Sequence, residues 1–170
     1  INGFHLGNSI SEYTSPIIKD KVIILRTTNG TRAINICKSA KNLIIGCFLN
    51  KTACCHYLLV LGCDILIVCS GKEGNFGIED AVFAGACVNI LEQLMSNIEK
   101  TDSALACEMM YQQSKSNILN LLRKSEHGKY LINIGLDDDL ILCAREDVST
   151  VVPIYFDGKI INDDQSSGWI

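Results

Sequence analysis

The sequence predicts an α/β fold: a layered domain with a mainly parallel sheet and a helical C-terminal half. Two observations support this prediction. Three short apolar runs, at residues 22–26, 43–48 and 65–69, are each followed by a helical pattern, and such alternation is typical of parallel sheets with right-handed crossovers. Between residues 101 and 143, helical patterns then succeed one another.

The first predicted strand, residues 22–26, is apolar along almost its whole length, as expected for a strand buried on both faces. It ends at the polar segment 27–31, and apolar residues at helical spacing follow at residues 33–37. The second predicted strand, residues 43–48, precedes a helix that extends to Leu61. The order strand, loop, helix therefore occurs twice in the first 61 residues.

The third predicted strand, residues 65–69, leads into a glycine-rich loop at residues 70–77 and then into a long helix over about residues 78–97. A β pattern returns at residues 150–156, where Asp157-Gly158 is a hairpin signal. Four further helices are predicted to begin at polar segments, namely Thr101-Asp102-Ser103, Ser114, Ser125 and Asp137-Asp138-Asp139.

The composition indicates one folded domain, residues 1–162, followed by a polar tail at residues 163–170. Hydrophobic residues make up 48% of the 170 residues, which excludes a disordered chain. Lys and Arg number 15 against 19 Asp and Glu, a formal net charge of −4, and this acidic balance argues against a nucleic-acid partner. Because no apolar run reaches the roughly 18 residues of a membrane span, no membrane partner is expected.

The chain contains nine cysteines at irregular spacings, which argues against a disulfide framework. Most lie within apolar runs, as Cys63, Cys69 and Cys87 do. We therefore expect most cysteines to be buried and reduced, and the protein to be cytoplasmic.

Ligands of open α/β sheets bind beyond the carboxyl ends of the strands. The segment Thr27–Thr31 lies at such an end and leads directly into a helix, whose free N–H groups attract anions. Its threonine hydroxyls are further donors. The same residue types also form ordinary helix caps and tight turns, so this pattern leaves both interpretations open. If an anion binds here, we expect this loop to face the loop at residues 70–77.

The loop at residues 70–77 contains Gly71, Lys72 and Gly74 but lacks the Gly-Lys-Ser/Thr ending of a P-loop. It is therefore either a loop that closes over an anionic substrate or a plain flexible connection. A cysteine-phosphatase site is also excluded, because Asn75 stands six positions after Cys69, where such a site needs an arginine.

Glu79 and Asp80 follow this loop in the first turn of the predicted long helix. Paired carboxylates beside a phosphate site suit Mg²⁺, although acids in a first turn also complement the helix dipole. His127 is a candidate general acid, and a solvated histidine at a helix end is its alternative interpretation.

Seven motifs occur along the chain in a known order. They are Gly3-Phe4-His5-Leu6-Gly7-Asn8-Ser9, Thr27-Thr28-Asn29-Gly30-Thr31-Arg32-Ala33, Gly46-Cys47-Phe48-Leu49-Asn50, Ser70-Gly71-Lys72-Glu73-Gly74, Glu79-Asp80, Asp102-Ser103-Ala104 and Gly135-Leu136-Asp137-Asp138-Asp139. Together they resemble the 2-phosphosulfolactate phosphatase family, and the likeness extends to about Tyr155.

The resemblance implies a Mg²⁺-dependent phosphoric monoester hydrolase that converts 2-phosphosulfolactate, or a similar small anionic phosphomonoester, to sulfolactate and phosphate, a step toward coenzyme M. It also implies an α/β fold and a homodimer. With the residues above, it makes Glu79 and Asp80 the metal candidates and Asp80 and His127 the catalytic candidates. The expected substrate-binding residues are Asn8, Ser9, Thr27, Thr28, Asn29, Gly30, Thr31, Arg32, Gly71, Lys72 and Gly74.

The sequence also departs from the family pattern. Two upstream motifs of the family, acidic-x-Leu-Arg-Ala-Thr and Gly-Glu-Arg-x-Gly, do not occur in it, so the chain resembles the family without its N-terminal segment. His5 stands where an acid is usual, Arg26 where a Thr is usual and Cys47 where a Ser is usual. The alternative prediction is an inactive or truncated anion-binding domain of the same fold.

Overall fold

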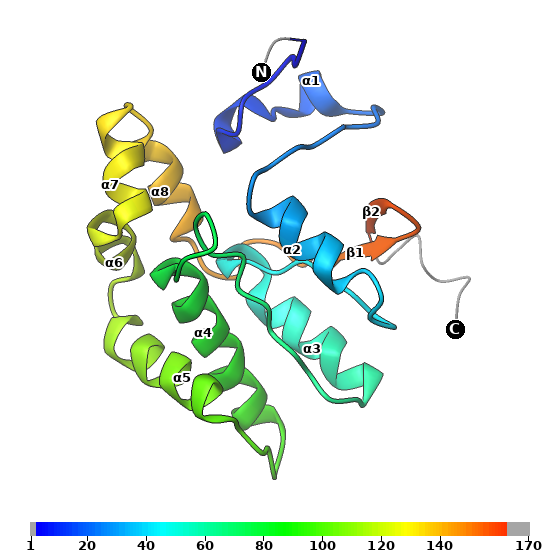
Figure 1. Ribbon diagram of the computed structural model, residues 1–170, viewed down its shortest axis with the longest axis vertical. Coiled ribbons are helices and arrows are strands. Elements are labelled where there is room, and N and C mark those ends of the chain that lie inside the picture. The colour runs from blue at the N-terminus through cyan, green and yellow to red at the C-terminus, as the bar shows by residue number, and fades with distance from the viewer. Residues whose placement is uncertain (1–2, 163–170) are drawn as a thin grey trace.

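The computed structural model describes residues 3–162 and shows a predominantly helical chain (Figure 1). Helix α4 lies between α3 and α5, and α6, α7 and α8 gather at one end of this group. The predicted tail at residues 163–170 lies outside the described residues. The elements are η1 (Ile10–Glu12), α1 (Ser15–Ile18), α2 (Gly30–Cys37), η2 (Phe48–Asn50), α3 (Lys51–Leu61), α4 (Ile78–Leu94), α5 (Asp102–Ser114), α6 (Ile118–Lys124), α7 (Glu126–Asn133), α8 (Asp137–Cys143), β1 (Pro153–Phe156) and β2 (Lys159–Asn162).

The prediction of a mainly parallel sheet is wrong. Within residues 3–162, the sheet has two strands, β1 and β2, which pair antiparallel. Asp157-Gly158 joins them with positive φ at both positions, as the hairpin signal predicted. Of the three predicted strands, one makes contact with this hairpin, because Ile44 forms an isolated antiparallel bridge with Ile154.

The other two predicted strands, residues 22–26 and 65–69, lack regular secondary structure and have no backbone–backbone hydrogen bond to any other residue in the described range. A helix satisfies its backbone groups within one segment, whereas a strand needs a neighbouring strand. The described part of the chain supplies no such neighbour to these two runs, so apolar composition alone did not produce a sheet.

The helical predictions are largely confirmed. Helix α4 ends three residues before the predicted limit, and Ser125 caps α7 through its side chain, which accepts a hydrogen bond from the Gly128 amide. Thr101 caps α5 in the same way. The helix expected from Ser114 begins instead at Ile118, because the Asn117 side chain provides its cap.

The main apolar core joins α4 to the C-terminal helices. Gly85 makes this packing close, because a Cβ there would lie 2.0 Å from the backbone oxygen of Cys107 on α5. Phe48 and Phe83 meet edge to face, with ring centroids 5.5 Å apart. The buried members of the core are Phe48, Val82, Ala86, Tyr111, Ile118, Leu122 and Leu140. None of the described helices is both long and apolar enough to cross a membrane.

Candidate functional site

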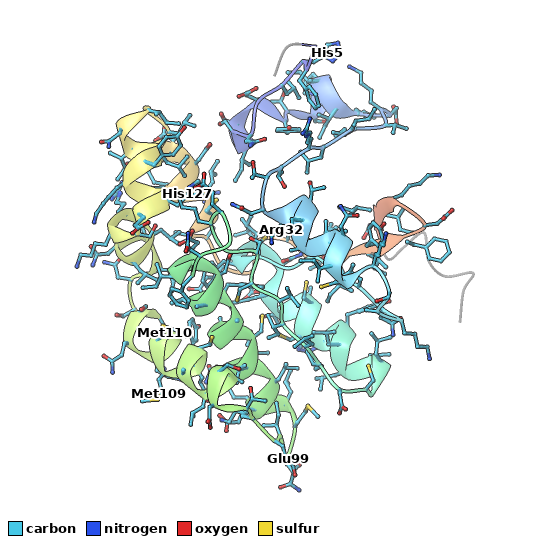
Figure 2. All side chains as sticks on the ribbon, in the orientation of Figure 1. His5, Arg32, Glu99, Met109, Met110 and His127 are labelled. Carbon is cyan, nitrogen blue, oxygen red and sulfur yellow. The ribbon has the colours of Figure 1, made fainter. Side chains whose placement is uncertain are left out.

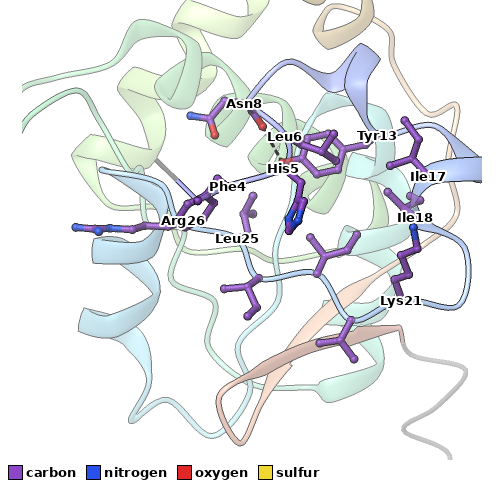
Figure 3. A pocket seen from close by; sticks show the side chains of 15 residues that line it. Phe4, His5, Leu6, Asn8, Tyr13, Ile17, Ile18, Lys21, Leu25 and Arg26 are labelled. Carbon is purple, nitrogen blue, oxygen red and sulfur yellow. Dashed lines mark hydrogen bonds between the residues drawn. The ribbon is translucent and has the colours of Figure 1, made fainter. Parts of the chain in front are cut away.

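An open hollow of about 990 Å³ lies against the first turns of α2 and is lined by five of the eleven predicted substrate-binding residues, Asn8, Thr27, Thr28, Thr31 and Arg32. Two arginines, Arg26 and Arg32, give it positive charge. Figure 2 labels Arg32 on α2, and Figure 3 shows Arg26 at the rim of the neighbouring hollow. The lining residues are Phe4, Leu6, Gly7, Asn8, Arg26, Thr27, Thr28, Thr31, Arg32, Asn35 and Ile36.

The segment Thr27–Thr31, here called the anion loop, closes on itself before α2 begins. The Thr31 amide donates to the Thr27 hydroxyl at 3.0 Å, and the Thr27 amide donates to the Thr31 hydroxyl at 3.1 Å. The two hydroxyls lie 3.3 Å apart. The capping interpretation is confirmed, since these threonines close the turn before α2, and the same turn lies on the wall of a hollow with two arginines.

The amide of Gly30 has no hydrogen-bond partner among the described residues. It belongs to the first turn of α2, where unpaired N–H groups and the helix dipole favour an anion. No hydrogen bond of the Thr28 hydroxyl is present within residues 3–162 either. Arg32 and Thr28, which line the hollow, and the Gly30 amide of the same loop are therefore donors without a hydrogen-bond partner among the described residues.

Asn29 connects the anion loop to the segment Ser70–Gly77, here called the glycine loop. Its side-chain oxygen accepts a hydrogen bond of 3.0 Å from the Glu73 amide. A Cβ placed on Gly74 would lie 3.9 Å from the Arg32 guanidinium. The two loops therefore face each other, as the sequence predicted, although no strand precedes either of them.

Asp80 holds the glycine loop in place. Its carboxylate accepts hydrogen bonds from the Gly71 amide at 2.6 Å and from the Ser70 hydroxyl at 3.2 Å. Gly71 has a φ of +64°, and a Cβ there would lie 2.3 Å from the Asn75 backbone oxygen, so only glycine fits this turn. Asp80, a metal and catalytic candidate, is thus engaged with the backbone of the loop.

The remaining candidates lie outside the hollow. The Ser9 hydroxyl is buried and donates to Asp139 at 3.0 Å, so Ser9 fastens the N-terminal segment to α8. His127 is exposed on α7 and stacks on Tyr130, with ring centroids 6.1 Å apart. One long ion pair connects α7 to the glycine loop: the Lys72 ammonium lies 3.9 Å from the Glu126 carboxylate.

The described side chains do not form a magnesium site by themselves. Within residues 3–162, no group of three or more His, Cys, Asp or Glu side chains could hold a metal ion. The Glu79 side chain is half-buried and makes no hydrogen bond in this range, whereas Asp80 accepts both of its hydrogen bonds through Oδ2. Magnesium coordination at this point needs oxygen ligands beyond Glu79.

Sequence reasoning left Arg26 and Asn35 out of the substrate-binding residues, although both line the hollow. A signal existed for each. Arg26 directly precedes the anion loop. Asn35 lies four residues after Thr31, and this spacing places Asn35 and Thr31 on one face of the helix. The Asn35 side chain accordingly donates to the Thr31 backbone oxygen at 3.0 Å.

A second hollow of about 740 Å³ adjoins the first and is lined mainly by apolar side chains of the N-terminal segment and residues 22–26. Figure 3 shows His5 pointing into it, beside the hydrogen bond from the Tyr13 hydroxyl to the Gly7 oxygen. His5, which stands at the usual acid position of the family motif, thus lies in a largely apolar hollow that shares Arg26 with the first hollow.

The expectation that most cysteines are buried is wrong. All nine are free thiols, but only Cys54, Cys55 and Cys87 are buried. Cys63 and Cys69 are exposed, because the segment that carries them has no covering partner strand among residues 3–162.

Comparison with known proteins gives one consistent result. A family model described as 2-phosphosulpholactate phosphatase matches residues 1–158. A probable 2-phosphosulfolactate phosphatase of Clostridium botulinum (strain Eklund 17B) is 38% identical over 161 residues, which cover 95% of this chain and 67% of that protein. The protein of the same name from Symbiobacterium thermophilum is 34% identical, with 95% and 69% covered.

A third relative with this name, from Clostridium acetobutylicum, is 34% identical over 161 residues, or 95% of this chain and 68% of its own length. In all three comparisons, nearly the whole chain matches, whereas about one third of the relative lies outside the match.

Proposed function

Since this chain belongs to the 2-phosphosulfolactate phosphatase family, we propose that it is a phosphoric monoester hydrolase. Its substrate is 2-phosphosulfolactate or a similar small anionic phosphomonoester, which water cleaves to sulfolactate, or the corresponding alcohol, and phosphate. The hollow beside α2 is the binding site. The observation that supports this most directly is the pairing of Arg26 and Arg32 on one hollow with the anion loop.

Charge and donor geometry support an anionic substrate. Each guanidinium presents planar paired donors that match the oxygens of a phosphate or carboxylate. Thr28 lines the same hollow, and the first-turn amides of α2 also favour a negative group. Phosphoryl transfer depends mainly on positioning and charge stabilisation, and this set of donors supplies both.

The glycine loop supports the same proposal as a cover for the substrate. Asp80 fixes its first residues, and Asn29 fixes Glu73 opposite the anion loop. In the proposed reaction, Asp80 therefore acts by holding Gly71 and Lys72 in place. His127 is the proposed general acid, and the contact between Lys72 and Glu126 supports this role by bringing the first turn of α7 toward the loop.

Magnesium dependence belongs to the proposal through Glu79, whose carboxylate makes no hydrogen bond within residues 3–162, and through Oδ1 of Asp80, because both hydrogen bonds of that carboxylate go to Oδ2. Because the described residues do not complete a site, no step is derived through the metal. Homodimerisation, a place in coenzyme M synthesis and a cytoplasmic location, which nine free thiols favour, are likewise proposals.

An inactive anion-binding domain is the second candidate function. It is favoured by the engagement of Asp80 with the glycine loop and by the lack of a metal-binding cluster within residues 3–162. This candidate keeps the hollow, its two arginines and anion binding, and differs from the first only in turnover.

Titration calorimetry with inorganic phosphate and with 2-phosphosulfolactate tests the binding site. Arg32→Gln should weaken binding about 10- to 100-fold, the usual loss for a charge-assisted hydrogen bond. Arg145→Gln is the matched control, because Arg145 is exposed and does not line the hollow, and it should change affinity less than twofold. Equal affinity in the two variants would place the anion elsewhere.

A phosphate-release assay with and without Mg²⁺ then separates the two candidates. Turnover of 2-phosphosulfolactate that depends on Mg²⁺ and falls in Glu79→Gln supports the hydrolase. Anion binding that Arg32→Gln abolishes, without turnover under either condition, supports the binding domain.

A further inference from the structure

The hollow beside α2 has two walls that come from different parts of the chain. One wall consists of the anion loop, Arg26 and α2, and the other is the N-terminal wall, formed by Phe4, Leu6, Gly7 and Asn8. Neither wall is part of the main core, because α2 has no buried residue and none of the four N-terminal residues is buried. The shape of the hollow therefore depends on what connects each wall to the packed helices.

The anion loop is connected to the core through α4. The Asn29 side chain accepts from the Glu73 amide of the glycine loop, and Asp80 accepts from the Gly71 amide of the same loop. Asp80 lies in the first turn of α4, which contributes Val82 to the main core. A carboxylate at the start of a core helix thus holds this side of the hollow.

The N-terminal wall includes a closed turn at residues 7–13, here called the N-terminal turn. The Gly7 amide donates to the Glu12 carboxylate at 2.6 Å, and the Gly7 carbonyl oxygen accepts from the Tyr13 hydroxyl at 2.8 Å. These bonds hold both ends of the turn together. Asn8 follows Gly7, so whatever holds the turn also holds the Asn8 backbone.

A buried hydrogen bond connects the N-terminal turn to α8. The Ser9 hydroxyl donates to Asp139 at 3.0 Å, and these two residues are 6% and 7% exposed. Asp139 lies in the first turn of α8, beside the core residue Leu140. The other hydrogen bonds of residues 3–13 in the described range stay within that segment. Because its acceptor is a carboxylate, this bond is stronger than a bond between neutral groups.

We propose that Asp139 is a positioning residue for the anionic substrate. Through Ser9 it holds the N-terminal turn against α8, and it thereby keeps Asn8 on the hollow that Arg32 also lines. The Asn8 amide can donate to a substrate oxygen. This role rests on the proposed function, because it takes the hollow as the binding site. Figure 3 labels Asn8 and Arg26, which line both hollows.

Titration calorimetry with inorganic phosphate tests this role. Asp139→Ala and Ser9→Ala break the same bond from opposite sides, and each should weaken binding about 3- to 10-fold, the usual loss for one neutral hydrogen bond, here that of Asn8. Asp139→Asn keeps an oxygen that can accept from Ser9, so its affinity should stay within about twofold of the wild type. If Asp139→Ala does not fold, Ser9→Ala decides the question, because it retains the carboxylate.

Asp137→Ala is the matched control. Asp137 lies in the same first turn of α8 and accepts from Arg123 at 2.9 Å, but it does not line the hollow. Its loss should change the affinity for phosphate by less than about twofold, although it also removes a carboxylate from α8. A loss of affinity in Asp137→Ala as large as that in Asp139→Ala would reject a specific role for Asp139.

A double-mutant cycle with Asn8→Ala separates positioning from general damage to the fold. If Asp139 acts through Asn8, adding Asp139→Ala to Asn8→Ala should change the affinity by less than about twofold, because the positioned amide is already absent. A further 3- to 10-fold loss in that background, on the order expected for an independent hydrogen bond, would overturn the proposal. Urea unfolding of each variant measures the change in stability separately from the change in affinity.

Arg32→Gln distinguishes failure of this role from failure of the proposed function. If Arg32→Gln weakens phosphate binding whereas Asp139→Ala and Ser9→Ala do not, the hollow binds the anion and the role of Asp139 is wrong. If none of the three variants weakens binding, the hollow is not the anion site, and both proposals are wrong.

Discussion

The helices α4–α8 bury many of their apolar side chains, whereas the two extended segments at residues 22–26 and 64–69 leave several of theirs exposed. Both regions are rich in apolar residues, and both were assigned a structure from their pattern. The helices bury their apolar side chains against one another, with Val82 and Leu122 in the main core. The extended segments leave Val22 and Leu66 in solvent.

The two regions differ in where their backbone groups find hydrogen-bond partners. In α4, each backbone N–H meets a carbonyl four residues earlier, so the segment needs only its own residues. A run such as residues 65–69 must find another strand, and that strand can lie anywhere in the sequence or in another chain. A helix can therefore be predicted from its own segment, whereas a strand cannot.

Thiol labelling should give the largest contrast between the regions. Cys87 is buried on α4, and its contact with Cys55 together with burial raises the pKa of its thiol. Cys63 is exposed beside the segment at residues 64–69. A bulky maleimide should label Cys63 more than about 1,000-fold faster than Cys87, since the buried thiol reacts only through opening of the fold. Mass spectrometry of timed samples measures both rates, and similar rates would show that α4 is not stably packed.

Shortening one leucine in each region should show the same contrast in stability. Leu91 is 2% exposed between α3 and the extended segment, so Leu91→Ala should lower the free energy of unfolding by about 2–5 kcal/mol. Leu66→Ala, at 85% exposure, should change it by less than about 0.5 kcal/mol. Urea unfolding followed by circular dichroism measures both. A cost above about 1 kcal/mol for Leu66→Ala would mean that its segment is already covered.

Breaking the ion pair that joins α3 to the C-terminal region should lower the free energy of unfolding by less than Leu91→Ala does. The buried Lys51 ammonium donates to Asp147 and lies 3.3 Å from Glu146, while the Thr52 amide donates to Asp147 at 2.8 Å. Asp147→Asn should destabilise the fold by about 1–3 kcal/mol at pH 7, because it leaves a buried cation poorly paired. Thr101→Ala, which removes a helix cap at a distance from this pair, serves as the comparison and should cost about 1 kcal/mol at any pH.

The pH dependence of that effect has a definite sign. Burial opposes ionisation of Asp147, but the hydrogen bonds from Lys51 and Thr52 outweigh it and hold the pKa of this carboxyl below its ordinary value of 3.8. A lowered pKa stabilises the fold above the ordinary value and ceases to do so as the pH falls through the lowered one. The difference in stability between the wild type and Asp147→Asn should therefore shrink below about pH 4. A difference that stays constant from pH 7 to pH 3 would contradict this account.

Much of the helical structure was predictable because its signals are local. Ser125 predicted the start of α7, and three aspartates predicted α8, since caps and first-turn acids act within one turn. The position of the anion loop before α2 was equally readable, because Thr27 and Thr31 are four residues apart and bond each other. The two loops were also predicted to face each other, but from parallel strands that the described residues do not form, and the hydrogen bond from the Glu73 amide to Asn29 joins them instead.

Hydrogen-bond partners that are distant in sequence could not be predicted from local sequence patterns. Ser9 was expected to bind substrate, yet it bonds Asp139, 130 positions away. Asp80 was expected to bind metal, yet it accepts from the Gly71 amide. No sequence pattern marked Lys51, although its buried ammonium pairs with the partly exposed Asp147, 96 positions away. Each of these polar groups has several possible partners, and only the packed chain selects one.

The sequence by itself determined the helices, their caps, the hairpin turn and the anion loop, because bonds between residues a few positions apart form all of them. The tertiary structure alone decided whether the apolar runs at residues 22–26 and 65–69 became paired strands, and where the Asp80 carboxylate points. A strand edge and a half-buried carboxylate such as that of Asp80 are each satisfied by groups outside their own segment. Their state therefore depends on which other parts of a polypeptide reach them, and no local pattern contains that information.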